Sequence, residues 1–98
     1  MKKEQVIATL RAHQRELRDR GVRHAALFGS IARGEDDVTS DIDVLIELEP
    51  QAPVGLFEYV GIEQYLDDLF VGRVDVANRE SLKAHVRPSA ERDAIYAF

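Results

Sequence analysis

Apolar residues recur at spacings of three and four along two segments, and this spacing predicts a helix in each. The first helix is expected over residues 3–20, and Gly21 suits its C-terminal end. Its inner side comprises Val6, Ile7, Leu10, His13 and Leu17. The second helix is expected after Pro53, within residues 52–70. Its apolar side comprises Leu56, Tyr59, Val60, Ile62, Leu66 and Leu69, and the aromatic residues Phe57, Tyr65 and Phe70 are also expected in the core or at an interface.

Three shorter apolar segments predict strands over residues 22–29, 41–48 and 72–78. Side chains alternate between the two faces of a strand. The second strand therefore has an apolar face of Ile42, Val44, Ile46 and Leu48 and an opposite face of Asp41, Asp43, Leu45 and Glu47. In the third strand, Arg73, Asp75 and Ala77 share one face, and Val74 and Val76 share the other.

The segment after residue 80 has a weaker pattern. It predicts a turn or short helix over residues 80–85, another helix after Ser89 and a last strand over residues 94–98. Because helices and strands alternate along the chain, the predicted fold is α/β, a small sheet with helices packed on it. The length of 98 residues predicts a single domain over residues 1–98.

Composition and charge narrow the function. The chain is 45% hydrophobic and 32% charged, which is typical of a globular protein. Its net charge of −5 argues against direct binding to a nucleic-acid backbone. The absence of cysteine excludes disulfides and thiolate metal sites. The N-terminal segment is charged throughout and no stretch is apolar enough to span a bilayer, so we expect neither a signal peptide nor membrane association, and a cytoplasmic location.

Asp41 and Asp43 begin the second predicted strand and point to the same side. Their carboxylates are then expected about 5–7 Å apart, given the rise of a strand. Two neighbouring anions are well compensated by Mg²⁺, which prefers carboxylate, water and phosphate oxygens. A bare Asp-x-Asp is more often a turn residue followed by a strand residue that faces solvent.

Gly29 and Ser30 lie where the first predicted strand gives way to a helical turn. Such a turn presents free backbone amides, and glycine lets the backbone approach an oxyanion closely. The Ser30 hydroxyl would add a donor, so that the turn predicts a phosphate-sized cradle. The alternative is that Ser30 is an ordinary N-cap residue, a position that serine favours.

Asp75 lies on the third predicted strand between two valines. If this strand neighbours the second, Asp75 joins the Asp41–Asp43 pair, as a metal ligand or as the base for an attacking hydroxyl. The alternative is a strand-face acid that pairs with a cation such as Arg73. The three histidines, His13, His24 and His85, show no metal-ligand spacing, and His13 is expected to pack against the core.

The order of these features resembles a known signature. Gly29-Ser30, ten intervening residues and Asp41-x-Asp43 are similar to the motif of the polymerase-beta-type nucleotidyltransferase superfamily. The segment GSIARGEDDVTSDIDVLI particularly resembles the minimal nucleotidyltransferases, the MNT-type antitoxins paired with HEPN toxins. The resemblance covers most of the chain and implies a small mixed sheet of the nucleotidyltransferase type.

The resemblance also implies a role for each matching residue. Gly29 and Ser30 would hold the nucleotide phosphates, Asp41 and Asp43 would bind two Mg²⁺ ions, and Asp75 would be the third carboxylate. Arg33 would contact phosphate or brace the loop, although an ion pair with an acid of the run Glu35-Asp36-Asp37, which is expected to be a solvated loop surface, is an equally good interpretation.

The implied reaction transfers AMP from ATP to a tyrosine hydroxyl of the partner HEPN ribonuclease toxin, in a hetero-oligomer with that toxin. The chain alone is too small to wall a full substrate pocket, so a partner could supply the acceptor. One alternative is a non-catalytic antitoxin that neutralises its toxin by direct binding. Transfer to a small molecule and template-dependent polymerisation rank lower, because related enzymes are larger and a duplex needs a basic surface.

Overall fold

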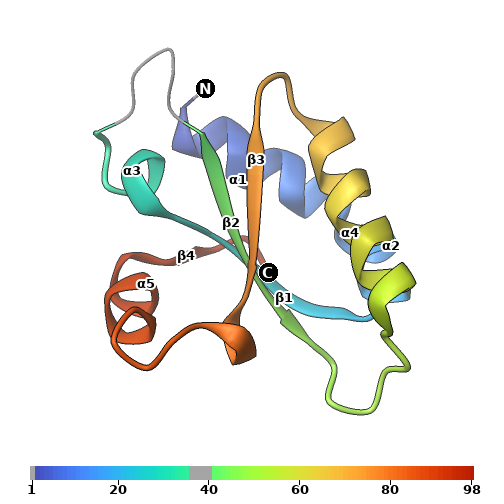
Figure 1. The fold of residues 1–98 in the computed structure, drawn as a ribbon. Coiled ribbons are helices and arrows are strands. Elements are labelled where there is room, and N and C mark those ends of the chain that lie inside the picture. Colours follow the sequence, from blue (N-terminus) through green and yellow to red (C-terminus); the bar gives the residue numbers. More distant parts are fainter. Residues whose placement is uncertain (1, 36–40) are drawn as a thin grey trace.

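The computed structural model describes residues 2–35 and 41–98, and these form a sheet of four strands in the order β3–β2–β1–β4 (Figure 1). The strands are β1 (Val22–Phe28), β2 (Ile42–Leu48), β3 (Val74–Asn78) and β4 (Ile95–Tyr96). β1 is antiparallel to both β2 and β4, whereas β3 runs parallel to β2. The predicted mixed α/β fold is confirmed.

Three helices cover one face of the sheet. They are α1 (Lys3–Ala12), α2 (Gln14–Asp19) and α4 (Leu56–Leu69). Their inner side chains meet the apolar face of β1 and β2 in one core cluster, whose fully buried members include Leu10, Leu17, Leu27, Val44, Ile46, Ile62 and Leu66. The alternation predicted for β2 therefore places Asp43 on the face away from this core.

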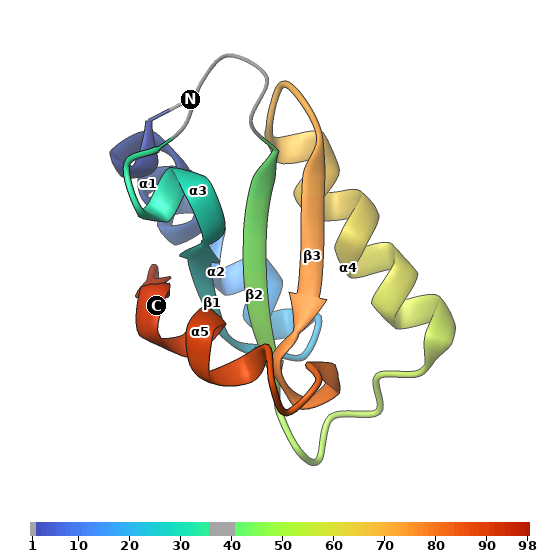
Figure 2. The same cartoon turned by 60° about the vertical axis from the view of Figure 1, so that its left-hand side comes forward.

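The opposite face of the sheet is only partly covered. Figure 2 shows the short helix α5 (Arg87–Asp93) on this side, next to β1 and the lower part of β2, whereas α3 (Gly29–Ala32) follows the upper end of β1, where β2 starts. Ala26, Leu45 and Ala90 are buried but lie outside the main core cluster. α5 therefore shields part of this face, and the half nearer the start of β2 and β3 is not covered by it.

The first predicted helix is interrupted at His13, where α1 ends and α2 begins. The His13 backbone N–H donates to the Leu10 carbonyl at 3.2 Å, three residues back instead of four. The Thr9 carbonyl that it leaves accepts instead from His13 Nδ1 at 2.8 Å. The imidazole also packs edge-to-face on Tyr65, with ring centroids 6.0 Å apart, so that the predicted packing of His13 is confirmed.

The predicted apolar side of α4 is partly wrong. Leu56 and Val60 are 77% and 42% exposed. Phe57 is 89% exposed, so its predicted place in the core is wrong and only the predicted interface role remains. At about 100° per residue, Leu56 and Val60 lie well away from the stripe of Ile62 and Leu66 that faces the sheet. Their spacing placed Leu56 and Val60 on the predicted apolar side of α4, but the part of the helix that contacts the sheet is narrower than that side.

The C-terminal segment follows the prediction with shifted boundaries. A 3-10 turn covers Arg79–Ser81, α5 begins at Arg87 rather than after Ser89, and β4 is shorter than the predicted strand. α5 has a proline in its first turn, a position that proline tolerates because it needs no intrahelical amide bond there. Across residues 2–35 and 41–98, no helix has the length and apolar character needed to cross a membrane.

Leu66 and Leu56 offer a matched test of how α4 packs. Leu66→Ala is expected to lower the free energy of unfolding by about 2–5 kcal/mol, because it leaves a cavity in a fully buried position. Leu56→Ala, on the exposed side of the same helix, should change it by less than about 0.5 kcal/mol. Chemical denaturation of the two variants measures the difference, and equal losses would contradict this packing of α4.

Candidate active site

The fold brings together two acids that are far apart in the sequence. β2 and β3 pair in parallel with Asp43 directly opposite Asp75. Side chains at paired positions of neighbouring strands share a face, and such strands lie about 4.8 Å apart. Both carboxylates are therefore on the open face of the sheet, near the starts of their strands.

Asp41 precedes β2 and lies two residues before Asp43. Burial, followed by the negative charges of Asp75 and Asp41, raises the pKa of the Asp43 carboxyl above its usual range, whereas the positive charge of Arg33 opposes this shift. The charges of Asp75 and Asp41 thus both act on the Asp43 carboxyl. When Asp43 is ionised, the negative charges of Asp41 and Asp75 repel it.

Gly29 lies against this cluster. It has a positive φ of 77°, which side-chain-bearing residues rarely adopt. A Cβ atom at this position would lie 3.0 Å from the Asp43 Cγ atom and closer still to its Oδ2 atom. The end of β1 can therefore touch the Asp43 carboxylate only because residue 29 has no side chain.

The Ser30 side chain does not cap the helix that follows. The N-cap of α3 is Phe28, and this helix has no side-chain cap, so the interpretation of Ser30 as an ordinary N-cap residue is wrong. Ser30 instead lies one residue after Gly29, within the first turn of α3. Phe28, which the sequence did not single out, pairs with Asp43 across β1 and β2.

Arg33 follows α3 and is held by two carboxylates. Its Nε donates to Glu35 Oε2 at 3.0 Å, and its Nη1 donates to Asp93 Oδ2 at 3.3 Å. Hydrogen bonds to Glu35 and Asp93 raise the pKa of the guanidinium further, so Arg33 is permanently charged. The predicted pairing with Glu35 is confirmed, whereas Asp36 and Asp37 lie outside the described residues. The partner Asp93 is sixty positions away and left no signal in the sequence.

Asp75 also has a cationic neighbour. Arg73 Nε lies 3.5 Å from Asp75 Oδ1, and both side chains are largely exposed. The pairing that was considered as an alternative role for Asp75 is therefore present. Exposed pairs of this kind contribute about 0–1 kcal/mol, so a competing cation or ligand displaces Arg73 at little cost.

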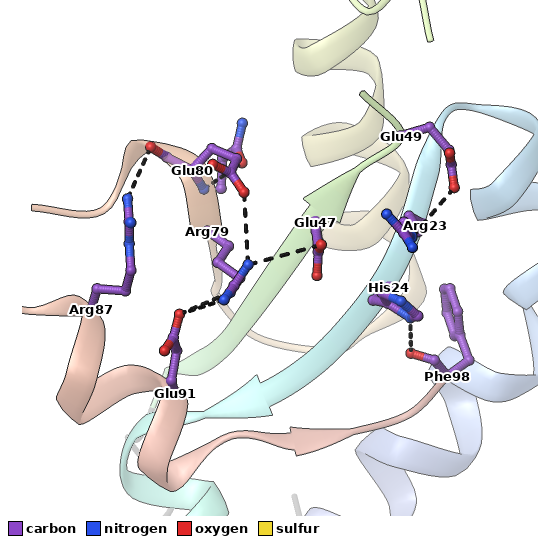
Figure 3. Close-up of polar contacts among 10 residues, drawn as sticks. Arg23, His24, Glu47, Glu49, Arg79, Glu80, Arg87, Glu91 and Phe98 are labelled. Carbon is purple, nitrogen blue, oxygen red and sulfur yellow. Dashed lines mark hydrogen bonds and ion pairs between the residues drawn. The ribbon is translucent and has the colours of Figure 1, made fainter. Parts of the chain in front are cut away.

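A second arginine anchors α5 on the open face (Figure 3). Arg79 donates to Glu91 Oε1 from Nε at 2.9 Å, and its Nη2 lies at the same distance from that oxygen. Its Nη1 lies 3.9 Å from Glu47 Oε1 on β2. Arg79 and Arg33 thus tie the C-terminal end of α5, through Glu91 and Asp93, to the sheet and to the residue that follows α3. The sequence pattern gave no indication of this network.

The donor set suits a hard divalent cation. Asp41, Asp43 and Asp75 supply only carboxylate oxygens, the ligands that Mg²⁺ prefers. Within residues 2–35 and 41–98, no three acidic or histidine side chains are placed closely enough to hold an ion as they stand. Burial and, after it, the negative charges of Asp75 and Asp41 raise the pKa of Asp43, and a cation bound here would neutralise these charges.

Comparison with known proteins assigns the family. The model of the nucleotidyltransferase domain family matches residues 10–97. The chain belongs to this family. It is 38% identical over 94 residues to the protein adenylyltransferase MntA of Thermococcus cleftensis, covering 95% of this chain and 93% of the relative. A candidate protein adenylyltransferase of Methanocaldococcus jannaschii is 40% identical over 89 residues, 89% of each chain.

Solved structures agree on the fold. A structure described as a candidate minimal nucleotidyltransferase superposes with a TM-score of 0.79 at 29% identity, covering 97% of this chain and 95% of the other. A toxin–antitoxin structure with AMP-PNP gives a TM-score of 0.71 at 18% identity, over 92% of this chain and 72% of the other, which supports the fold alone. The resemblance to minimal nucleotidyltransferases is confirmed, and the chain is a nucleotidyltransferase enzyme.

The raised pKa of Asp43 predicts how stability depends on pH. A carboxyl whose folded-state pKa is raised stabilises the fold while protonated, and this contribution is lost as pH rises through the folded pKa. Ionised Asp43 therefore destabilises the cation-free protein at neutral pH. In the presence of a chelator, Asp43→Asn should unfold at higher denaturant concentration than the natural protein at pH 7, and this advantage should fade near about pH 4. An unchanged difference across this range would contradict the electrostatic origin.

Gly29 and Gly34 test the contact between β1 and Asp43. Both have positive φ, of 77° and 76°, but a Cβ atom at Gly34 would meet no heavy atom within 4 Å. Gly34→Ala should therefore lower the free energy of unfolding by only about 1–2 kcal/mol, the penalty of the backbone conformation. Gly29→Ala should lower it more, because the methyl group also overlaps the Asp43 carboxylate. Thermal unfolding of the two variants measures both losses, and equal losses would contradict a contact between Gly29 and the Asp43 carboxylate.

Proposed function

We propose that this nucleotidyltransferase transfers AMP from ATP to a tyrosine hydroxyl of a HEPN-type ribonuclease toxin, and so acts as its antitoxin in a complex with that toxin. Its relative in Thermococcus cleftensis carries the name protein adenylyltransferase, and two of its structural neighbours are described as toxin–antitoxin structures. The proposal places the reaction in the cytoplasm, where ATP is available.

The observation that carries the proposal is the pairing of Asp43 with Asp75 beside Gly29. A turn that tolerates no side chain, two acids at the start of β2 and a third acid on β3 follow one another across the sheet. This spatial order suits an in-line displacement at phosphorus, in which the leaving group and the attacking oxygen lie on opposite sides of the phosphorus atom.

In this assignment, the amides around Gly29 and Ser30 hold the triphosphate. Arg33 exchanges its exposed partner, the Glu35 carboxylate, for a phosphate oxygen. The acceptor oxygen forms a bond to the α-phosphorus, the bond to the bridging oxygen breaks, and pyrophosphate leaves on the Gly29 side. The hydroxyl proton passes to Asp75, the acid nearest the edge of the sheet.

Asp41, Asp43 and Asp75 are the residues that would hold two Mg²⁺ ions. When bound, these ions would neutralise the charge that builds on the phosphoryl oxygens. The protein's own part is to keep three carboxylates on one face of the sheet and to bring the backbone of Gly29 against Asp43. Asp41 and Asp75, whose charges both act on the Asp43 carboxyl, would supply the further anionic ligands that a second ion needs.

Transfer is tested by incubating the chain and the toxin with Mg²⁺ and ATP labelled in the α-phosphate. Label on a toxin tyrosine is expected. Asp43→Asn should lower the rate by about a hundredfold or more, because charge stabilisation of the transition state is lost. Glu49→Gln, which removes a charge from an exposed position just after β2, serves as the matched control and should keep the rate.

Two outcomes would contradict the proposal, one for the transfer and one for the assigned site. Tight binding and inhibition of the toxin without any label, even at high Mg²⁺, would mean that the chain neutralises by contact alone. Near-normal labelling by a folded Asp43→Asn protein would mean that the acids are not the site. When label is transferred, mass spectrometry of the toxin identifies the modified residue.

A further inference from the structure

β3 is an edge strand. In the described part of the chain it pairs with β2 on one side, and no strand lies on its other side. Figure 1 shows β3 at the margin of the sheet, with α4 beside and behind it. The outer edge of such a strand presents unpaired backbone N–H and C=O groups, which an extended peptide can pair with.

Two hollows lie where α4 meets β3, and together they form what we call the α4–β3 groove. The first, of about 450 Å³, is lined by Tyr59, Val76, Ala77, Asn78, Ser81 and Leu82. The second, of about 560 Å³, is lined by Val60, Glu63, Gln64, Asp67, Asp68 and Val74. The groove thus combines apolar and uncharged polar side chains at the Asn78 end of β3 and is acidic at the Val74 end, on either side of the position of Asp75.

Alternation along a strand connects this groove with the candidate active site. Val74 and Val76 face the core side, where α4 lies, and Asp75 faces the open side with Asp43. A peptide residue paired beside Asp75 would point to the open face, and its two neighbours would point into the groove. One neighbour would meet the acids of α4, and the other would meet the apolar hollow.

The acids at this end of α4 are unfavourable for the helix itself. Asp67 and Asp68 lie in its last turn, which contains no basic residue, where the helix dipole repels negative charge. They are also exposed. Together with Glu63 they favour a basic side chain in the groove. They disfavour a second copy of this chain, because pairing two β3 edges would bring two acidic groove walls together.

We propose that the α4–β3 groove and the free edge of β3 bind the acceptor segment of the protein substrate as an added strand. The segment has a tyrosine beside Asp75, a basic residue on one side of it and an apolar residue on the other. This inference rests on the proposed transfer to a protein hydroxyl. It adds the path by which the hydroxyl arrives, from the side of β3 opposite to the phosphate-holding turn at Gly29.

Short synthetic peptides test the recognition. Peptides centred on Lys-Tyr-Leu and Leu-Tyr-Lys cover both strand directions, and control peptides have glutamate in place of lysine or N-methyl groups on alternate amides. With the full chain, Mg²⁺ and α-labelled ATP, a lysine peptide should accept label at least roughly tenfold faster than the glutamate peptides. N-methylation should abolish the preference, because the added strand loses its backbone hydrogen bonds.

Two charge reversals on the same helix provide the matched variants. Asp67→Lys in the groove should raise the KM for the lysine peptide about tenfold and leave ATP binding unchanged. Glu58→Lys, an equal charge change at an exposed position outside the groove, should leave both unchanged. The helix dipole makes Asp67→Lys the more stable of the two, so that a loss of peptide use cannot come from unfolding.

Hydrogen exchange on residues 74–78 separates this inference from the proposed function. Protection by the lysine peptide that Asp67→Lys weakens, without any label transfer, would support the groove and reject the activity. Labelling of the toxin that neither Asp67→Lys nor an excess of lysine peptide reduces would reject the groove and keep the activity. Equal use of lysine and glutamate peptides would likewise overturn the proposal.

Discussion

The contact between Gly29 and the Asp43 carboxylate is the constraint on which the site depends. Positive φ and the absence of a side chain let the end of β1 approach β2 at the point where the acid stands. The same approach partly buries Asp43, and burial is the largest cause of its raised pKa. A backbone turn that could hold phosphate and a carboxylate that could hold a cation are thereby kept in contact by one glycine.

The rest of the fold buries one face of the sheet and leaves part of the other face, where this contact lies, accessible. α1, α2 and α4 bury the apolar face of the sheet, while α5 covers only part of the opposite face. Arg79 and Arg33 hold α5 through ion pairs with Glu91 and Asp93. α5 held in this position leaves Asp75 exposed at the edge of the sheet. Like charges gathered on an open face are unfavourable for the isolated protein, and such local conflicts are typical of functional sites.

An exposed acid on an edge strand also explains how a chain of 98 residues could act on a protein. A chain of this size can enclose little of an acceptor. A free sheet edge can instead bind the backbone of an acceptor segment by hydrogen bonds, and the neighbouring helix can select among its side chains. The acids in the last turn of α4 reduce the stability of that helix. In the proposed binding mode, these acids beside β3 offset this loss by binding a basic side chain of the acceptor segment.

By itself, the sequence determined the elements and the faces of the strands, because local spacing carries that information. The alternation in β2 placed Asp41 and Asp43 on one side, and the glycine-serine turn ended β1 where predicted. The same spacing misjudged Leu56 and Val60, since the width of a helix contact depends on what packs against it. Only the tertiary structure decided that Asp75 stands opposite Asp43, that Asp93 holds Arg33, and that β3 has a free edge. These relations join residues far apart in the chain, and strand order is set by packing of the whole core rather than by any local pattern.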